Sequence, residues 1–256
     1  MSRFPRKTVR ECTEFEGKGL HSGEPTTATV HPGESGIVFF SGKTRTPAVP
    51  ENVTDTSRCT RLGEISTIEH LMSAFAALGV TDAEVEVTGA ELPAMDGCAL
   101  AFFEGLKKLG LQEIGEREVP LPFERVFHVD GEVKIAVSSG QGLWRYEFEC
   151  GDRWPGSQHF EFSFPGDYGV EVAPARTFAF EEEMEMVRAA GLGRGLDATT
   201  AFVIGRTGYV NETRFTDEPA RHKLLDLVGD LYLSGIPPVF LNVVSTRSGH
   251  RHNVAA

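Results

Sequence analysis

The spacing of apolar residues predicts strands and helices mixed along the whole chain. Two helices are expected in the first half, at 66–78 and 98–109, because apolar side chains recur three or four positions apart there. A glycine that can end a helix, Gly79 or Gly110, follows each of them. Short strands are expected where apolar and polar residues alternate, at 26–30, 36–40 and 83–87.

The second half repeats this plan without a close residue-level repeat. Strands are expected at 133–137, 144–148, 160–164, 201–204, 209–210 and 239–245, and helices at 181–190 and from about Pro219 onward. The charged stretch 111–122, which ends with two prolines, is the candidate linker. The pattern favours an α+β layered fold with two domains, residues 1–116 and 117–256.

Composition narrows the class of protein. The 256 residues carry a formal net charge of -12, which argues against nucleic acid as the main partner, because phosphates are bound by clusters of Lys and Arg. The four cysteines include no CxxC pair, so we expect reduced thiols and no structural zinc knuckle. With neither an N-terminal apolar segment nor a stretch able to span a bilayer, we expect a cytoplasmic protein without a transmembrane segment.

Candidate chemistry begins with His222, Asp226 and Asp230, which lie four residues apart on the predicted C-terminal helix. Residues at this spacing form one stripe on a helix, so a histidine and a carboxylate can reach the same metal ion. The stripe is also consistent with a solvated polar face opposite an apolar one. In the metal-binding interpretation, the stripe lies in a cleft between the two halves.

Catalytic zinc usually has three protein ligands and an open position, so a third ligand is needed. His70 in the segment Thr67-Ile68-Glu69-His70 is the best candidate, with Glu69 beside it as a base. Ser66 and Glu69 also match a capping box, in which Glu69 would only satisfy the helix N-terminus. The sequence leaves both interpretations open.

A loop at Ser248-Gly249-His250 is the next candidate, because a histidine after a glycine can approach a site. The alternative is a flexible basic tail, since the chain ends six residues later. Two further segments are singled out: Ala175-Arg176-Thr177-Phe178, and the glycine-rich turn 17–23, which fits neither nucleotide-binding glycine motif.

Together these segments resemble one family, UDP-3-O-acyl-N-acetylglucosamine deacetylase, the zinc amidase of lipid A synthesis. The matching segments, in chain order, are Gly19-Leu20-His21-Ser22-Gly23, Thr67-Ile68-Glu69-His70-Leu71, Glu91-Leu92-Pro93-Ala94-Met95-Asp96-Gly97, Ala175-Arg176-Thr177-Phe178, Arg221-His222-Lys223-Leu224-Leu225-Asp226 with Asp230, and Ser248-Gly249-His250. The resemblance implies two similar layered sheet-and-helix domains with the metal site at their interface. It also implies an acyl-passage insert in the second domain, near 143–164.

The resemblance also implies a role for each site residue. The metal ligands would be His70, His222 and Asp226, holding Zn²⁺, with Fe²⁺ possible because both metals suit these ligands. The other implied residues are Glu69 as general base, Thr177 for the oxyanion, His250 as acid oriented by Asp230, Lys223 for the oxyanion or diphosphate, and His21 and Phe178 on the substrate side.

The implied reaction is hydrolysis of the N-acetyl group of UDP-3-O-acyl-N-acetylglucosamine, with acetate released, by a monomeric enzyme whose partner is this nucleotide-sugar lipid precursor. Two alternatives stay open. One is a related zinc amidase for another N-acetylated sugar or nucleotide, motivated by Thr199, where the family usually has an acidic residue. The other is a non-catalytic metal-binding homologue.

Overall fold

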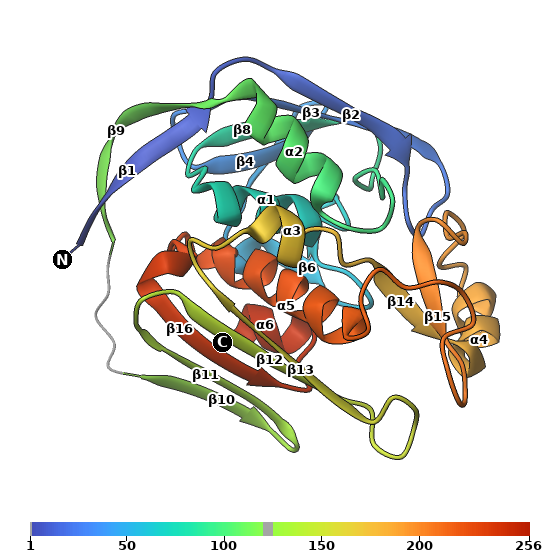
Figure 1. The fold of residues 1–256 in the computed structure, drawn as a ribbon. Coiled ribbons are helices and arrows are strands. Elements are labelled where there is room, and N and C mark those ends of the chain that lie inside the picture. The colour runs from blue at the N-terminus through green and yellow to red at the C-terminus, as the bar shows by residue number, and fades with distance from the viewer. Residues whose placement is uncertain (1, 120–124) are drawn as a thin grey trace.

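Two five-stranded sheets enclose a layer of helices in the computed structural model, which describes residues 2–119 and 125–256 (Figure 1). The first sheet has the order β2-β3-β8-β4-β5, with β2 Thr13–Lys18, β3 Pro25–Pro32, β8 Ala83–Val87, β4 Ile37–Ser41 and β5 Thr44–Pro47. The second has the order β10-β11-β16-β12-β13, with β10 Val126–Asp130, β11 Val133–Ser139, β16 Leu241–Thr246, β12 Leu143–Glu149 and β13 Ser157–Ser163.

The two sheets share one topology. In each, the last strand in sequence lies at the centre, antiparallel to one neighbour and parallel to the other. A helix precedes and another follows that central strand: α1 Glu69–Leu78 and α2 Leu100–Leu109 around β8, and α5 Glu218–Leu231 and α6 His250–Ala255 around β16. This repeat of strand order confirms the predicted α+β class with two similar sheet-and-helix units.

Smaller elements flank the two sheets. The strands β1 Ser2–Val9 and β9 Leu111–Val119 form an antiparallel ribbon, and β6 Val53–Asp55 pairs with β7 Arg61–Leu62. A separate parallel pair, β14 Thr177–Phe180 and β15 Ala201–Ile204, carries the helix α4 Met184–Ala189 between its strands (Figure 1). A short helix, α3 Tyr168–Glu171, precedes this unit.

The segment predicted as a linker, 111–122, is a paired strand over the residues that the structure describes, and its role as a linker stays a prediction. Residues 111–119 are β9, which pairs with β1 from the other end of the first half, while 120–122 lie outside the described residues. Most side chains of β9 are exposed, because a two-stranded ribbon has little core to face. The predicted boundary between 116 and 117 falls within β9, and the division into two domains stays a prediction.

Helix ends also differ from the prediction. Helix α1 begins at Glu69 instead of residue 66, and no side chain caps its N-terminus, so the capping-box interpretation of Glu69 is wrong. The helix expected at 181–190 is a 3-10 turn, Glu181–Glu183, followed by α4. The segment after Gly249 is the helix α6 and not an irregular tail.

The segment 143–164, expected to form an acyl passage, provides β12 and β13 of the second sheet. Its alternating apolar side chains are largely buried in the core between this sheet and α5: Trp144, Tyr146, Phe148, Phe160 and Phe162. The assignment of an acyl passage to this segment stays a prediction.

Helices α1 and α5 cross at the centre of the molecule, and Gly229 lies at the crossing. A Cβ atom on Gly229 would overlap the carbonyl oxygen of Glu69 and come within 3.1 Å of the Ser73 amide nitrogen. The Ser73 hydroxyl also donates a hydrogen bond to the Leu225 carbonyl. The absence of a side chain at Gly229 therefore allows the first turn of α1 to lie against α5.

Gly229→Ala is expected to destabilise the protein by about 1–3 kcal/mol, because the added methyl group meets backbone that cannot move aside. In an exposed helix the same change would stabilise by up to about 1 kcal/mol. The sign, read from urea unfolding, therefore tests the packing. Gly105→Ala in α2 is the control, with a smaller cost because its obstacle at 2.7 Å is the Phe15 ring edge. A stabilised Gly229→Ala variant would contradict the crossing described here.

Candidate active site

Three side chains from α1 and α5 form a compact buried group. His70, His222 and Asp226 each offer one ligand atom, and these three atoms lie within 4.8 Å of one another. Asp226 Oδ1 is 3.6 Å from His70 Nε2 and 3.5 Å from His222 Nε2. His222 and Asp226 lie one turn apart on α5, while His70 comes from the first turn of α1, which the crossing at Gly229 brings alongside.

The group has the donors that a metal ion requires. Asp226 Oδ1 is buried and has no hydrogen-bond partner among the described residues, an arrangement that is costly unless a cation completes it. The Nδ1 atom of His222 lies 3.1 Å from the Ala175 carbonyl, which orients Nε2 toward Asp226. Two imidazoles and one carboxylate are the ligands of a three-residue zinc site with an open position.

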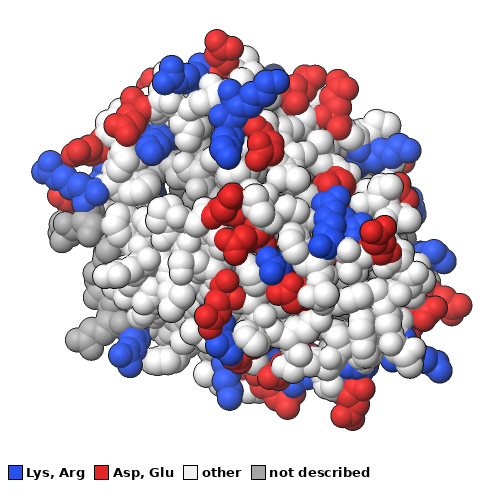
Figure 2. All heavy atoms as spheres, in the orientation of Figure 1, with Lys and Arg blue, Asp and Glu red and all other residues white. Residues whose placement is uncertain are grey.

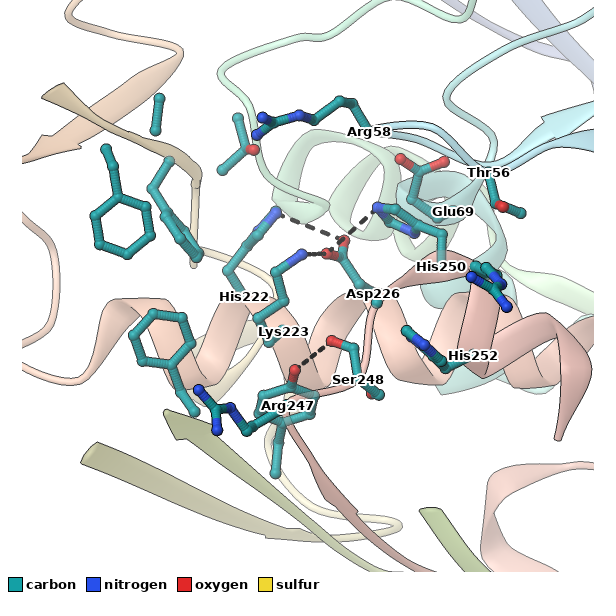
Figure 3. A pocket seen from close by; sticks show the side chains of 18 of the residues that line it. Thr56, Arg58, Glu69, His222, Lys223, Asp226, Arg247, Ser248, His250 and His252 are labelled. Atoms are coloured by element: carbon teal, nitrogen blue, oxygen red, sulfur yellow. Dashed lines mark hydrogen bonds and ion pairs between the residues drawn. The ribbon is translucent and has the colours of Figure 1, made fainter. Parts of the chain in front are cut away.

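The charge states of the group also suit metal binding. Burial lowers the pKa of His222 to about 3, so its imidazole is neutral. Burial opposes the ionised form of Asp226, but neighbouring cationic groups, Lys223 and His250 among them, outweigh it and hold its pKa well below the usual value. Lys223 Nζ donates to Asp226 Oδ2 at 2.8 Å, which leaves Oδ1 available (Figure 3). The Asp226 charge in turn raises the pKa of Lys223 against the effect of burial.

Glu69 lies beside this group at the start of α1 and lines the same pocket. Its side chain is buried, and Oε2 accepts a hydrogen bond from the Thr60 backbone N–H at 3.0 Å. Burial raises the pKa of the Glu69 carboxyl, although His250 and His70 oppose the shift. A carboxylate of raised basicity facing a pocket is the form that a general base takes.

His250 faces the pocket from the first residue of α6. Its Nδ1 lies 2.9 Å from Asp230 Oδ2, an oxygen that also accepts from Asn253 Nδ2 at 2.9 Å. Burial alone would lower the pKa of His250, but the charges of Asp230 and Asp226 and the hydrogen bond to Asp230 raise it to about 9. The imidazole is therefore held protonated at neutral pH.

These groups surround a pocket of about 460 Å³ (Figure 3). Of the residues predicted from the sequence, Glu69, His70, His222, Asp226, Lys223, His250, Thr177 and Phe178 line it. Asp230 lies behind His250, and the His222–Asp226–Asp230 stripe is buried, so the interpretation as a solvated face is wrong. Other lining residues were not predicted from the sequence, among them Thr56, Arg58, Tyr146, Glu183, Arg247 and His252.

Arg58 is the clearest of the missed residues. Its backbone has a left-handed φ of 71°, and its guanidinium pairs with Glu183 at 2.9 Å. The pair joins the loop before β7 to the segment after β14, two parts of the chain that no local pattern connects. This φ could not be predicted from the sequence, because arginine, unlike glycine, does not indicate a left-handed backbone.

His21 lies near the pocket without being part of its lining. The backbone N–H of His21 donates to Glu91 Oε1 at 2.8 Å, and both ring nitrogens are buried without a hydrogen-bond partner among the described residues. Burial lowers the pKa of His21, against the charge of Glu91. The neutral ring therefore keeps its donor and acceptor available.

A buried ion pair holds the two flanks of the site together. Arg176 Nε donates to Glu218 Oε1 at 3.1 Å, and the Arg176 backbone N–H donates to the same oxygen at 2.9 Å. Because Arg176 precedes Thr177 and Glu218 begins α5, the pair fixes β14 relative to the helix that carries His222. Leaving either charge unpaired would cost several kcal/mol, on the order of 3–5.

Comparison with known proteins matches this arrangement to one family. The family model described as LpxC: UDP-3-O-acyl N-acetylglycosamine deacetylase covers residues 6–256. The chain belongs to this family. It is 36% identical to the UDP-3-O-acyl-N-acetylglucosamine deacetylase of Aquifex aeolicus over 97% of this chain and 90% of the relative. It is 32% identical to the protein of that name from Leptospira biflexa, over 98% and 87% of the two chains.

The segments that carry the family resemblance gather around the pocket. Five of the six contribute lining residues. The sixth, 91–97, supports the others: the Glu91 carboxylate accepts from the His21 and Ser22 amides, and the Gly97 carbonyl accepts from the Thr177 amide at 2.8 Å. A family motif outside the pocket is therefore explained by backbone contacts to motifs inside it.

Charges of both signs are interspersed over the face shown in Figure 2. The expectation that nucleic acid is not the main partner stays a prediction. Among the helices that the structure describes, none has the length and apolar character needed to cross a membrane.

Asp226→Asn is expected to weaken zinc binding by more than the roughly 10- to 100-fold that loss of a supporting partner costs, because a ligand charge is removed. Dialysis against a chelator followed by measurement of zinc content at graded free zinc gives the affinity. Asp217→Asn is the matched control, since Asp217 precedes the same helix and pairs only with Arg221 among the ion pairs described. Equal affinity in the two variants would exclude Asp226 as a ligand.

Proposed function

We propose that the chain hydrolyses the acetamide of UDP-3-O-acyl-N-acetylglucosamine, releases acetate and so acts in lipid A biosynthesis. The observation that carries this proposal is the buried His70–His222–Asp226 group beside Glu69, in a chain that belongs to the deacetylase family. A site without catalysis would have no use for a buried carboxylate facing the same pocket, so the presence of Glu69 argues against a non-catalytic homologue.

His70, His222 and Asp226 would hold the metal, which we take to be zinc, although the same ligands suit Fe²⁺. A bound zinc ion supplies Lewis acidity, which makes water a stronger acid near neutral pH and polarises a carbonyl oxygen. The role of the chain is to keep the His222 imidazole neutral and oriented, through burial and through the Ala175 carbonyl.

Glu69 takes the proton from the attacking water, whose oxygen adds to the acetamide carbonyl carbon. Support comes from its burial, its raised pKa and its position in the pocket. His250, held as an imidazolium by Asp230, gives a proton to the amide nitrogen, so the C–N bond breaks and a neutral amine leaves. The surroundings of the two groups explain their different roles. Burial raises the pKa of Glu69, which makes it a stronger base, while Asp230 and Asp226 raise the pKa of His250 and keep it protonated.

The oxyanion would be stabilised by the Thr177 hydroxyl and by Lys223, both at the pocket. Loss of one such donor costs about 3–4 kcal/mol in other hydrolases. Arg58, Arg247 and Arg251 add positive charge to the lining, which suits a diphosphate in an otherwise acidic protein. The Phe178 ring, edge-on to His222 at 6.1 Å, and the partner-free ring of His21 would contact the sugar side of the substrate.

The acyl chain needs an apolar path next to the reaction site. A second pocket of about 340 Å³ lies between α4 and β15, lined mainly by aliphatic side chains, and Ala179 borders both pockets. We propose that the acyl chain enters here, with segment 143–164 contributing Phe148, whose ring packs edge-on against Phe178 at 5.5 Å. The unit β14–α4–β15 would then select acyl length.

Glu69→Gln is expected to lower kcat for acetate release by about 10²- to 10⁴-fold, the usual range for loss of a general base, with substrate affinity retained. The measurement is acetate release from UDP-3-O-acyl-N-acetylglucosamine by zinc-loaded protein. Glu149→Gln, also at the pocket lining, is the control for loss of one negative charge. A folded, zinc-loaded parent that releases no acetate would reject this substrate; activity on another acetylated sugar would then favour the related amidase.

Ala179→Leu is expected to raise KM for a long-acyl substrate at least about tenfold, because the larger side chain would block part of the acyl path. Displacing two CH₂ groups of the acyl chain, at about 0.8 kcal/mol each, is enough for a tenfold change. A short-acyl analogue, which would not extend past Ala179, should keep its KM. Steady-state kinetics with both substrates gives the comparison. Equal changes for both substrates would remove the acyl chain from this pocket.

A further inference from the structure

Thr60 is a fully buried residue between the base and the acid of the proposed reaction. It lies just before β7, and its carbonyl accepts a hydrogen bond from the Ile68 backbone N–H at 3.3 Å. The neighbouring Arg58 has a left-handed backbone, and Cys59 is buried. The position of Thr60 is therefore fixed by the turn of the chain that leads into α1.

The main chain of Thr60 holds Glu69. The Thr60 N–H donates to Glu69 Oε2 at 3.0 Å, and this contact connects residues nine positions apart across the turn. One carboxylate oxygen is thereby fixed, while the other has no partner described. A base held by one oxygen can present the other toward the pocket in a defined direction.

The side chain of Thr60 holds Asp230 in the other half of the molecule. Its hydroxyl donates to Asp230 Oδ1 at 2.5 Å, while Asp230 Oδ2 accepts from His250 and Asn253. Without Thr60, Oδ1 would be a buried carboxylate oxygen lacking this donor, and the carboxylate could turn about its Cβ–Cγ bond. The plane of the Asp230 carboxylate, and hence the direction of the His250 ring, depends on this hydroxyl.

We propose that Thr60 is a positioning residue that sets Glu69 and the Asp230–His250 pair in one frame, so that base and acid face the same substrate bond. The inference rests on the proposed function, in which these groups move the protons. Each half contributes two of these residues: Thr60 and Glu69 precede the second sheet, while Asp230 and His250 lie on α5 and α6. Thr60 therefore joins catalytic groups that no continuous element connects.

Thr60→Val tests the hydroxyl alone, because valine keeps the branched shape and the backbone N–H. We expect kcat to fall about 10- to 100-fold, the range for loss of a supporting partner, with KM and zinc content unchanged. Thr60→Ser restores the donor and should recover most of the activity. If the serine variant is as impaired as the valine variant, the methyl group and not the hydroxyl matters, and the proposal is overturned.

A double-mutant cycle distinguishes positioning from general damage to the fold. If Thr60 acts through Asp230 on His250, then adding Thr60→Val to His250→Gln should change the remaining kcat by less than a factor of about 2, which is the usual scatter in such cycles. Independent effects would instead multiply, and a full additional loss in the double variant would overturn the proposal.

Thr8→Val is the matched control. Thr8 is buried on β1, far from the pocket lining, and its hydroxyl accepts from the Gly33 amide at 2.9 Å. The unfolding midpoint of Thr8→Val measures how much stability the protein loses when a buried, hydrogen-bonded threonine is replaced by valine. Its kcat should equal that of the parent. An inactive parent would reject the proposed function, whereas an active parent with Thr60→Val as fast as Thr8→Val would reject only the role of Thr60. Should Thr60→Val fail to fold, Thr60→Ala against Thr60→Ser gives the same comparison.

Discussion

The crossing of α1 and α5 at Gly229 is the contact on which the site depends. Helix axes usually pack 8–10 Å apart, at a distance set by the side chains between them. With no side chain at Gly229, the backbone of Glu69 lies directly against α5. His70 on the first turn of α1 can then face Asp226, and Glu69 can reach the same pocket.

The site also concentrates ionisable groups that a folded chain normally keeps in water. Glu69, Asp226 and Asp230 are all buried, and each is compensated differently. Asp230 has three donors, Asp226 has Lys223 and an oxygen suited to a metal, and Glu69 has one donor and a raised pKa. These differences support the proposed roles, because a buried carboxylate with few hydrogen-bond donors is more basic than one with several.

The sequence predicted what periodicity and motifs encode: the α+β class, seven of the ten strands in the two five-stranded sheets, and a metal group with one ligand on a different helix. It could not predict contacts formed between distant segments. The β1–β9 ribbon pairs Val9 with Leu111, and its exposed, charged strand looks like a linker. Thr60 and Arg58 were not predicted, because their contacts depend on the direction of one hydroxyl group and on one backbone angle, and residue spacing predicts neither.

The shared strand order of the two sheets has a consequence for stoichiometry. Equivalent helices, α1 and α5, carry one and two of the candidate metal ligands, so the halves are alike in topology but unlike in chemistry. Neither half holds all three candidate ligands, and the repeated topology therefore produces a single asymmetric group instead of two equal ones. The chain is in effect a fused pair of half-sites, in which each repeat is incomplete without the other.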